Sequence, residues 1–313
     1  MLPSTRAPAR AKEVDYASVT GLRDHPVTAF CQPPCQMFIM QRVCVCGCVW
    51  MCVCHVRAQH HHLWDLRPAG ATNLFEQKVY LCQHIADDIN DSGHNVVQTV
   101  FAQCGAMYKV DGPEELRCVG ETEFVQGIVA MSNAGIYGRA RLCTGIFGSA
   151  DLNLGSAVEP VLLAHIAASS NFRGIRSPFP EDFEGSKFEQ GYAMLAKHNL
   201  AFDNYSPDYE RLPALAKLAA TQPTVPVIVN HLGGKIDPHM DDAEFSKWKV
   251  CIDAVAAVPN CVIKCGGAQQ RVGPDWEPPF HMHKRATPIG SSELCDLLFK
   301  FYSYLLRPSA LFS

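Results

Sequence analysis

The chain has 313 residues, of which 48% are hydrophobic and 19% charged, and its formal net charge is −4. This size and composition predict a substantial buried core and exclude collagen-like, coiled-coil and wholly disordered proteins. An isoelectric point near 6.3, without a long Lys/Arg run, argues against nucleic acid as a partner. We therefore expect a small-molecule substrate.

No apolar stretch of the sequence reaches the roughly 20 residues that a membrane-spanning helix needs. Residues 1–10 lack the apolar core of a secretory signal. We therefore predict a cytoplasmic protein without a membrane partner, and the composition leaves its oligomeric state open.

Residues 1–56 differ in composition from the remainder of the chain. Seven of the 15 cysteines fall between Cys31 and Cys54, where Val and Cys alternate in VCVCGCVWMCVC. A buried strand, a thiolate metal cluster and translated repeat DNA all explain this tract, because a GT repeat encodes alternating Val and Cys. Structural zinc sites normally combine C-x₂₋₄-C pairs with intervening structure, which favours the third explanation. We assign 1–56 as an irregular Cys-rich segment, an expected gene-model artefact, and 57–313 as the folded domain.

From residue 57 onward, short apolar runs rich in β-branched residues alternate with segments of helical period, which is typical of parallel α/β folds. Apolar spacing predicts helices near Phe188–Ala196 and Phe245–Val255, and Ser291–Leu306 is predicted as the last helix. Pro160 and Pro213 suit the first turns of two others. The predicted strands are Val56–Trp64, Val96–Gln103, Ala140–Phe147, Phe172–Arg176, Leu200–Asp203, Pro226–His231 and Cys261–Cys265.

Seven strands that are each followed by a helix predict an α/β protein with a TIM (β/α)₈-type barrel that lacks its eighth strand. The alternative is an open doubly wound sheet, whose dinucleotide-binding form carries G-x-G-x-x-G after its first strand. The sequence contains no such fingerprint there.

A histidine run marks the end of the first predicted strand, in QHHHLWD. Alternation along a strand places His60 and His62 on one side and His61 on the other. Two imidazoles on one side can share a metal ion or orient a water molecule, since neutral imidazole is both a ligand and a proton acceptor.

Polar residues also end three later strands and interrupt a fourth. His231 follows the apolar run VIVN and precedes Gly-Gly, at the strand end where parallel barrels place active sites. Arg176 in FRGIR suits a substrate carboxylate, and Asp203 ends the strand in AFDNY. Lys264 interrupts the buried strand CVIKCGG, where an ammonium requires either an ion pair or a polar cavity.

These motifs in their order, with GHNVVQTVFAQCGAMY and VGETEF, resemble the amidohydrolase-related family of TIM-barrel metal-dependent hydrolases. The similarity is strongest with its lactonase-like branch, which contains 2-pyrone-4,6-dicarboxylate lactonase and sugar lactonases. The resemblance implies a hydrolase of lactones or related C–O or C–N bonds.

The resemblance also implies residue roles. His60 and His62 match the H-x-H pair, His231 matches the histidine of strand six, and Arg176 matches the strand-four arginine that holds an anionic substrate. It implies either a divalent metal, Zn or Mn, on His60, His62 and His231, or metal-free catalysis. Asp203 and Lys264 are assigned to substrate binding. The family's eighth-strand Asp lies beyond Ser313, so we expect impaired activity from this chain.

Two other functions remain open. A metal-dependent decarboxylase of the same superfamily would use a similar histidine set, and release of carbon dioxide without lactone opening would identify it. A non-catalytic binding protein on a remnant barrel would show neither activity.

Overall fold

The computed structural model describes residues 38–39, 56–67, 78–180, 182–206, 208–267 and 291–306. Within them, eight strands form the main sheet in the order β1-β2-β5-β6-β7-β8-β9-β10. The strands are β1 (Phe38–Ile39), β2 (Val56–His61), β5 (Val96–Ala102), β6 (Arg141–Gly148), β7 (Phe172–Ser177), β8 (Ala201–Asn204), β9 (Val227–Val229) and β10 (Cys261–Ile263).

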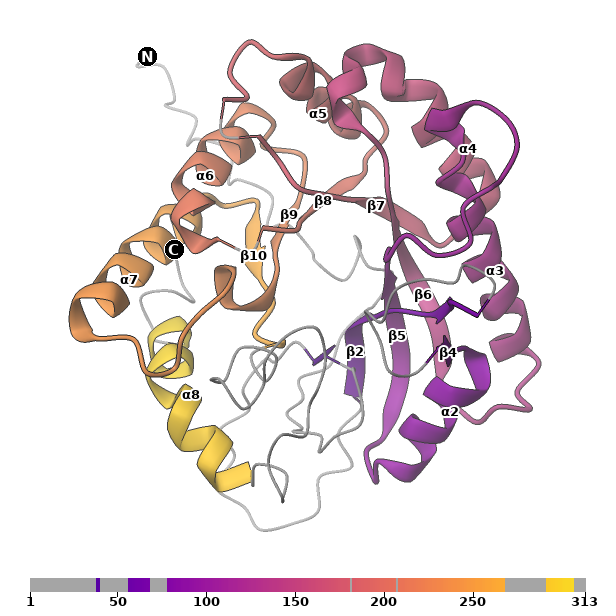
Figure 1. The fold of residues 1–313 in the computed structure, drawn as a ribbon, viewed down its shortest axis with the longest axis horizontal. Coiled ribbons are helices and arrows are strands. Elements are labelled where there is room, and N and C mark those ends of the chain that lie inside the picture. The colour runs from indigo at the N-terminus through magenta and orange to yellow at the C-terminus, as the bar shows by residue number, and fades with distance from the viewer. Residues whose placement is uncertain are drawn as a thin grey trace, which may run out of the picture.

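The seven strands from β2 to β10 are parallel, and β1 pairs antiparallel with β2. The sheet curls so that the helices lie along its outer side (Figure 1). The prediction of an α/β fold with seven strand-helix units is confirmed. In the described ranges β10 pairs only with β9, so the sheet is a curled half-barrel rather than a closed ring.

The helices follow the strands as the apolar spacing predicts. Ser186 and Asp241 cap the helices that follow them by accepting from the backbone N–H groups of Glu189 and Glu244. The helices are α2 (Cys82–Asp91), α3 (Val119–Asn133), α4 (Glu159–Ala168), α5 (Lys187–Lys197), α6 (Leu212–Thr221), α7 (Asp242–Ala256) and α8 (Ser291–Leu305), with short 3₁₀ turns at Glu114–Leu116, Leu152–Val158, Tyr209–Arg211 and His231–Gly233.

Four strands end earlier than the sequence predicts, and one of them, β5, stops a single residue early at Ala102. The first stops at His61, because Trp64 leaves the main sheet and pairs with Tyr80 in a separate ribbon of β3 (Trp64–Asp65) and β4 (Val79–Tyr80). The sixth stops at Val229 because the backbone turns to positive φ at His231, where extended pairing cannot continue. The seventh stops at Ile263, one residue before Lys264.

The core lies between the outer face of the sheet and the helices. Its largest fully buried side chains include Trp248 of α7, Tyr192 of α5 and Phe101 of β5. The N-terminal assignment falls largely outside the described residues, which include only Phe38–Ile39 and Val56 of residues 1–56. In the described part of the chain, no helix is both long and apolar enough for a membrane span.

A buried histidine outside the sheet gives a testable pH dependence. His165 of α4 contacts Thr122 Oγ1 at 2.8 Å and the carbonyl oxygen of Ser149 at 2.9 Å, and burial lowers its pKa to about 4. Below about pH 6.5 the unfolded chain binds a proton there that the folded protein does not. The free energy of unfolding should therefore fall by about 1.4 kcal/mol per pH unit from this group between pH 6.5 and 4.

Urea denaturation of the native protein and of His165→Gln at several pH values between 4.5 and 6.5 measures this contribution. The variant should lose stability less steeply as the pH falls. Glu121 acts in the opposite direction in both proteins, because burial raises its pKa to about 7 and the folded state retains its proton between pH 4.5 and 7. Equal slopes for the two proteins would show that His165 is not held neutral by the fold.

Candidate active site

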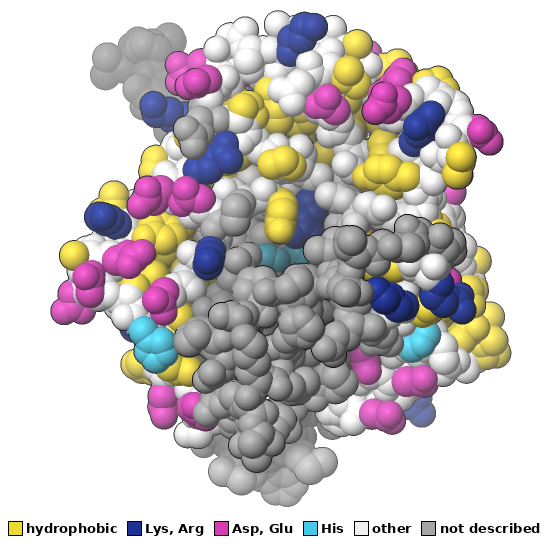
Figure 2. Space-filling model, in the orientation of Figure 1, with side chains coloured by type: hydrophobic (Ala, Val, Ile, Leu, Met, Phe, Trp, Pro, Cys, Tyr) yellow, Lys and Arg dark blue, Asp and Glu magenta, His cyan; other side chains and the backbone are white. Residues whose placement is uncertain are grey.

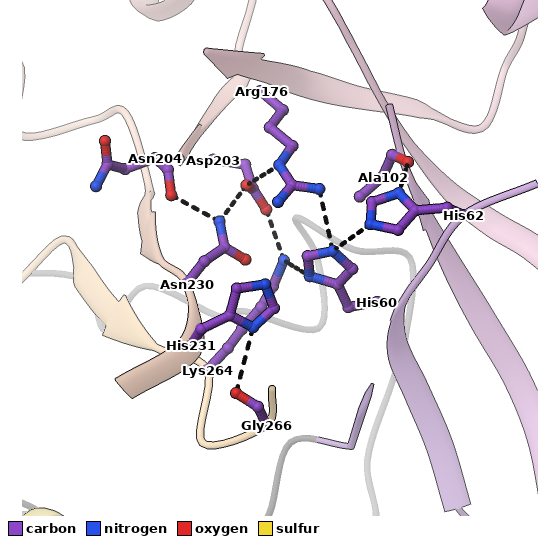
Figure 3. A network of polar contacts seen from close by, with 10 residues as sticks. All are labelled: His60, His62, Ala102, Arg176, Asp203, Asn204, Asn230, His231, Lys264 and Gly266. Carbon is purple, nitrogen blue, oxygen red and sulfur yellow. Dashed lines mark hydrogen bonds and ion pairs between the residues drawn. The ribbon is translucent and has the colours of Figure 1, made fainter. Parts of the chain in front are cut away.

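The carboxyl ends of five parallel strands bring the predicted polar residues together. Figure 3 shows side chains that lie on β2, β7 and β8, or directly after β2, β9 and β10, pointing toward one another. In the space-filling view, histidine and Lys or Arg atoms lie together in a hollow near the middle of the face (Figure 2). All six residues predicted from the sequence are members of this cluster: His60, His62, Arg176, Asp203, His231 and Lys264.

The three predicted imidazoles converge. Nε2 of His60 lies 3.1 Å from Nε2 of His62, and the ring centroids of His60 and His231 are 4.8 Å apart. His61 points to the other side of β2, where its Nε2 lies 2.9 Å from Thr99 Oγ1. Strand alternation thus separates His61 from its two neighbours, as the sequence predicts.

Backbone carbonyls fix which ring nitrogens carry protons. His62 Nδ1 donates to the carbonyl oxygen of Ala102 at 2.7 Å, and His231 Nδ1 donates to that of Gly266 at 3.3 Å. A carbonyl oxygen can only accept, so the neutral forms of both rings have a lone pair on Nε2. These two Nε2 atoms can therefore accept a proton or a hydrogen bond.

Two cations lie against His60, and one carboxylate pairs with both cations. Arg176 Nη1 lies 3.0 Å from His60 Nε2, and Lys264 Nζ lies 3.4 Å from His60 Nδ1. Lys264 Nζ donates to Asp203 Oδ2 at 2.6 Å, and Arg176 Nε lies 3.6 Å from Asp203 Oδ1. Arg176 and Asp203 are register partners on β7 and β8, which explains their pairing. Because the exposed fraction of each of these side chains is 4% or less, their charges are largely desolvated.

Burial and the two cations keep His60 and His62 neutral. Burial first, and Lys264 and Arg176 next, lower the pKa of His60 well below its usual 6.5. Burial and then Arg176 lower the pKa of His62 to about 3. Burial also lowers the pKa of Lys264, against the opposing effect of Asp203. The cluster thus combines neutral proton acceptors with the positively charged side chains of Arg176 and Lys264.

Asn230 belongs to this cluster and was not predicted from the sequence. Its Nδ2 donates to the Asp203 carboxylate and, at 2.7 Å, to the carbonyl oxygen of Asn204. Its Oδ1 is buried and has no hydrogen-bond donor among the described residues. The signal in the sequence is a polar residue directly before His231, at the end of an apolar strand.

Gly267 closes the cluster against His231. The residue has φ +83°, and a Cβ atom at this position would lie 1.9 Å from His231 Nδ1. The backbone after β10 therefore lies directly against the imidazole. Only glycine leaves room for the ring in its present position.

Replacing Gly267 with alanine should reduce turnover on the order of 10²-fold, because the new methyl group must displace the His231 ring by about an ångström or more. Steady-state kinetics of Gly267→Ala measure this effect. The matched control is Gly127→Ala on α3, where a Cβ atom meets nothing within 4 Å. The control should retain activity and gain about 0.5–1 kcal/mol of stability. Equal activity of the two variants would contradict the contact between Gly267 and His231.

A divalent metal fits this donor set only in part. A separation of 3.1 Å between His60 Nε2 and His62 Nε2 suits two ligands on a tetrahedral ion with bonds of about 2.0–2.1 Å. The Arg176 guanidinium and the Lys264 ammonium also lie next to His60, and both oppose a further cation. Asp203 already accepts hydrogen bonds from Lys264 and Asn230 and forms an ion pair with Arg176. No group of three or more metal-ligating residues is arranged for an ion in the described ranges.

A family model described as amidohydrolase matches residues 59–289. The chain belongs to the amidohydrolase family. The matched range contains every strand end that contributes to the cluster. Family membership indicates a hydrolase and leaves its substrate unassigned.

Individual proteins and solved structures are also similar to this chain. An uncharacterized Sinorhizobium fredii protein, y4mH, is 26% identical over 234 residues, which cover 66% of this chain and 71% of that protein. A crystal structure of a Burkholderia multivorans amidohydrolase with bound HEPES has a TM-score of 0.52 at 16% identity and covers 80% of this chain and 79% of its own.

A probable 2-pyrone-4,6-dicarboxylic acid hydrolase from Acinetobacter baumannii, solved with citric acid, has a TM-score of 0.54 at 11% identity. The match covers 80% of this chain and 78% of that one. A second crystal form of the Burkholderia protein contains zinc and matches with a TM-score of 0.49. At these identities the two structures with TM-scores above 0.5 support the fold alone.

Proposed function

We propose that this amidohydrolase hydrolyses a small carboxylated lactone. The observation that carries the proposal is the cluster itself, in which three converging imidazoles lie beside a buried guanidinium and a buried ammonium. The positive charge suits an anionic substrate, and the neutral imidazoles suit proton abstraction from water.

Arg176 is the proposed anchor for the substrate carboxylate. Asp203 contacts its Nε, His60 contacts its Nη1, and the ring of Tyr205 lies 4.7 Å from its Cζ. These contacts on separate sides fix the plane of the guanidinium, which leaves it oriented for a planar anion. Tyr205 is half-exposed and forms the outer side of this anchor.

His231 is the proposed general base. Its Nδ1 proton is held by Gly266, so its Nε2 is the atom that would take a proton from the attacking water. As water adds to the lactone carbonyl, negative charge develops on the carbonyl oxygen. The adjacent Lys264 would stabilise that charge in a buried, weakly screened environment. The proton on His231 then returns to the alkoxide that leaves on ring opening.

Assay of the purified full-length chain against a carboxylated pyrone lactone, a sugar lactone and a neutral lactone tests the proposal. Ring opening should be fastest with the carboxylated substrate. Parallel reactions with added Zn²⁺, added Mn²⁺ and a chelator separate metal-dependent from metal-free turnover, because neither is presupposed by the proposed proton transfers.

The two other functions give different results in the same experiment. Carbon dioxide release from a carboxylated substrate without lactone opening would replace the hydrolase by a decarboxylase. Saturable binding of the carboxylated lactone without any turnover would identify a binding protein. Either result would overturn the proposed hydrolysis.

A further inference from the structure

The turn that presents His231 has a strained backbone. Four consecutive residues, His231, Leu232, Gly233 and Gly234, have φ values of +51°, +60°, +94° and +142°. We call these four residues the elbow. Glycine adopts such angles freely, whereas each non-glycine residue in this region costs about 1–2 kcal/mol. Such a conformation persists only where the surrounding structure holds it in place.

Two hydrogen bonds hold the elbow at Leu232. Its N–H donates to the carbonyl oxygen of Lys264 at 3.1 Å, and its own carbonyl oxygen accepts from the indole Nε1–H of Trp248 at 3.0 Å. Leu232 and Trp248 are both fully buried, so water does not compete for the second bond. The indole bond therefore couples helix α7 directly to the backbone beside His231.

Packing behind the elbow leaves it little freedom. A Cβ atom at Gly233 would lie 2.8 Å from Leu212 Cδ1 of α6 and 3.1 Å from Ile252 Cδ1 of α7. The backbone of the elbow is thus pressed against both helices. Among these contacts, the bond from Trp248 is the one that a side chain makes to a polar atom of the elbow.

We propose that Trp248 is a positioning residue, whose indole N–H holds the strained elbow and thereby sets the direction of the His231 imidazole. The alternative is that Trp248 serves only as core packing, since it also contacts the rings of Phe245, Phe301 and Tyr304. The part of the proposal that concerns turnover rests on the proposed function. The part that concerns the orientation of His231 does not.

The test compares Trp248→Phe with Phe301→Leu in the full-length chain. Trp248→Phe keeps an aromatic ring in the core and removes the indole N–H. Phe301 is also fully buried and meets Trp248 edge to ring at 5.1 Å, so Phe301→Leu disturbs the same aromatic cluster without removing a bond to the elbow. Imidazole ¹⁵N spectra, assigned to His231 by the signals missing from His231→Asn, report ring orientation and mobility.

We expect the His231 ring signals to shift or broaden in Trp248→Phe and to remain unchanged in Phe301→Leu. With a lactone substrate, kcat of Trp248→Phe should fall about tenfold, as expected for the loss of one buried hydrogen bond. KM should remain within about twofold, because the contacts that orient the anchor at Arg176 come from Asp203, His60 and Tyr205. If Trp248 served only as core packing, both variants would have a lower melting temperature. Neither would then change kcat per folded molecule or KM.

Unchanged His231 signals in Trp248→Phe, or the same change in Phe301→Leu, would overturn the proposal. So would an unchanged kcat in an enzyme that turns over lactones. If no lactone is hydrolysed, the proposed function fails while the spectra still decide the orientation of His231. If Trp248→Phe does not fold, deuterium exchange of the Trp248 indole proton in the unaltered protein tests whether this N–H holds the elbow. Exchange as slow as global unfolding supports a fixed elbow, and faster exchange contradicts it.

Discussion

Replacing His231 with asparagine should reduce kcat by about 10²–10⁴, the range expected when a general base is removed. Asparagine is the suitable replacement because it tolerates positive φ better than most residues, and His231 has φ +51°. The elbow should therefore keep its shape while the proton acceptor is lost. Steady-state kinetics, with circular dichroism to confirm the fold, measure the effect.

The matched control for this variant is His61→Asn. His61 is also buried and lies in the same histidine run as His60, yet it faces Thr99 on the other side of β2. Its removal should lower stability without changing kcat per folded molecule. If His231→Asn retained activity within tenfold of the native protein, or if both variants lost activity equally, His231 would not be the base.

Replacing Asp203 with asparagine should lower the free energy of unfolding by about 3–5 kcal/mol. The carboxylate is fully buried between Lys264 and Arg176, and removing its charge leaves two buried cations without their anion. The amide is nearly the same size, so lost packing contributes little. Urea denaturation at pH 7 measures the change.

A double-mutant cycle separates charge from other effects. Adding Lys264→Met to Asp203→Asn removes one of the unpaired cations and should restore part of the lost stability. Glu159→Gln is the surface control, since Glu159 pairs with Lys197 in a largely solvent-exposed contact and should cost less than about 1 kcal/mol. Strictly additive effects in the cycle would show that Asp203 and Lys264 do not interact.

The parallel strands were predictable from the sequence because each is a short apolar run with a helical segment after it. The helix starts were predictable at Pro160 and Pro213, which occupy first turns as expected. The pairing of Trp64 with Tyr80 could not be predicted from the sequence, since two-residue strands leave no periodic signal. The pairing of Phe38–Ile39 with β2 was also missed, because the residues before 57 were set aside.

The convergence of His60, His62 and His231 was predictable because parallel strands bring their carboxyl ends to one rim. The contacts that give the site its chemistry could not be predicted, because they depend on the register between neighbouring strands. Arg176 opposes Asp203 only because β7 and β8 pair in one alignment. The roles that we assign to Trp248 and Gly267 could not be predicted either, since each acts through a neighbour far away in the sequence.

The contact between His60 and Lys264 joins residues that are 204 positions apart. His60 lies on the first of the parallel strands and Lys264 directly follows the last one described, so the cluster exists only when both ends of the sheet are docked. An early folding intermediate with most strands in place would still lack a working site. Turnover should therefore be lost when either end of the sheet opens locally, before the spectroscopic signals of secondary structure decline. The activity that remains would then measure the fraction of molecules in which both ends are docked.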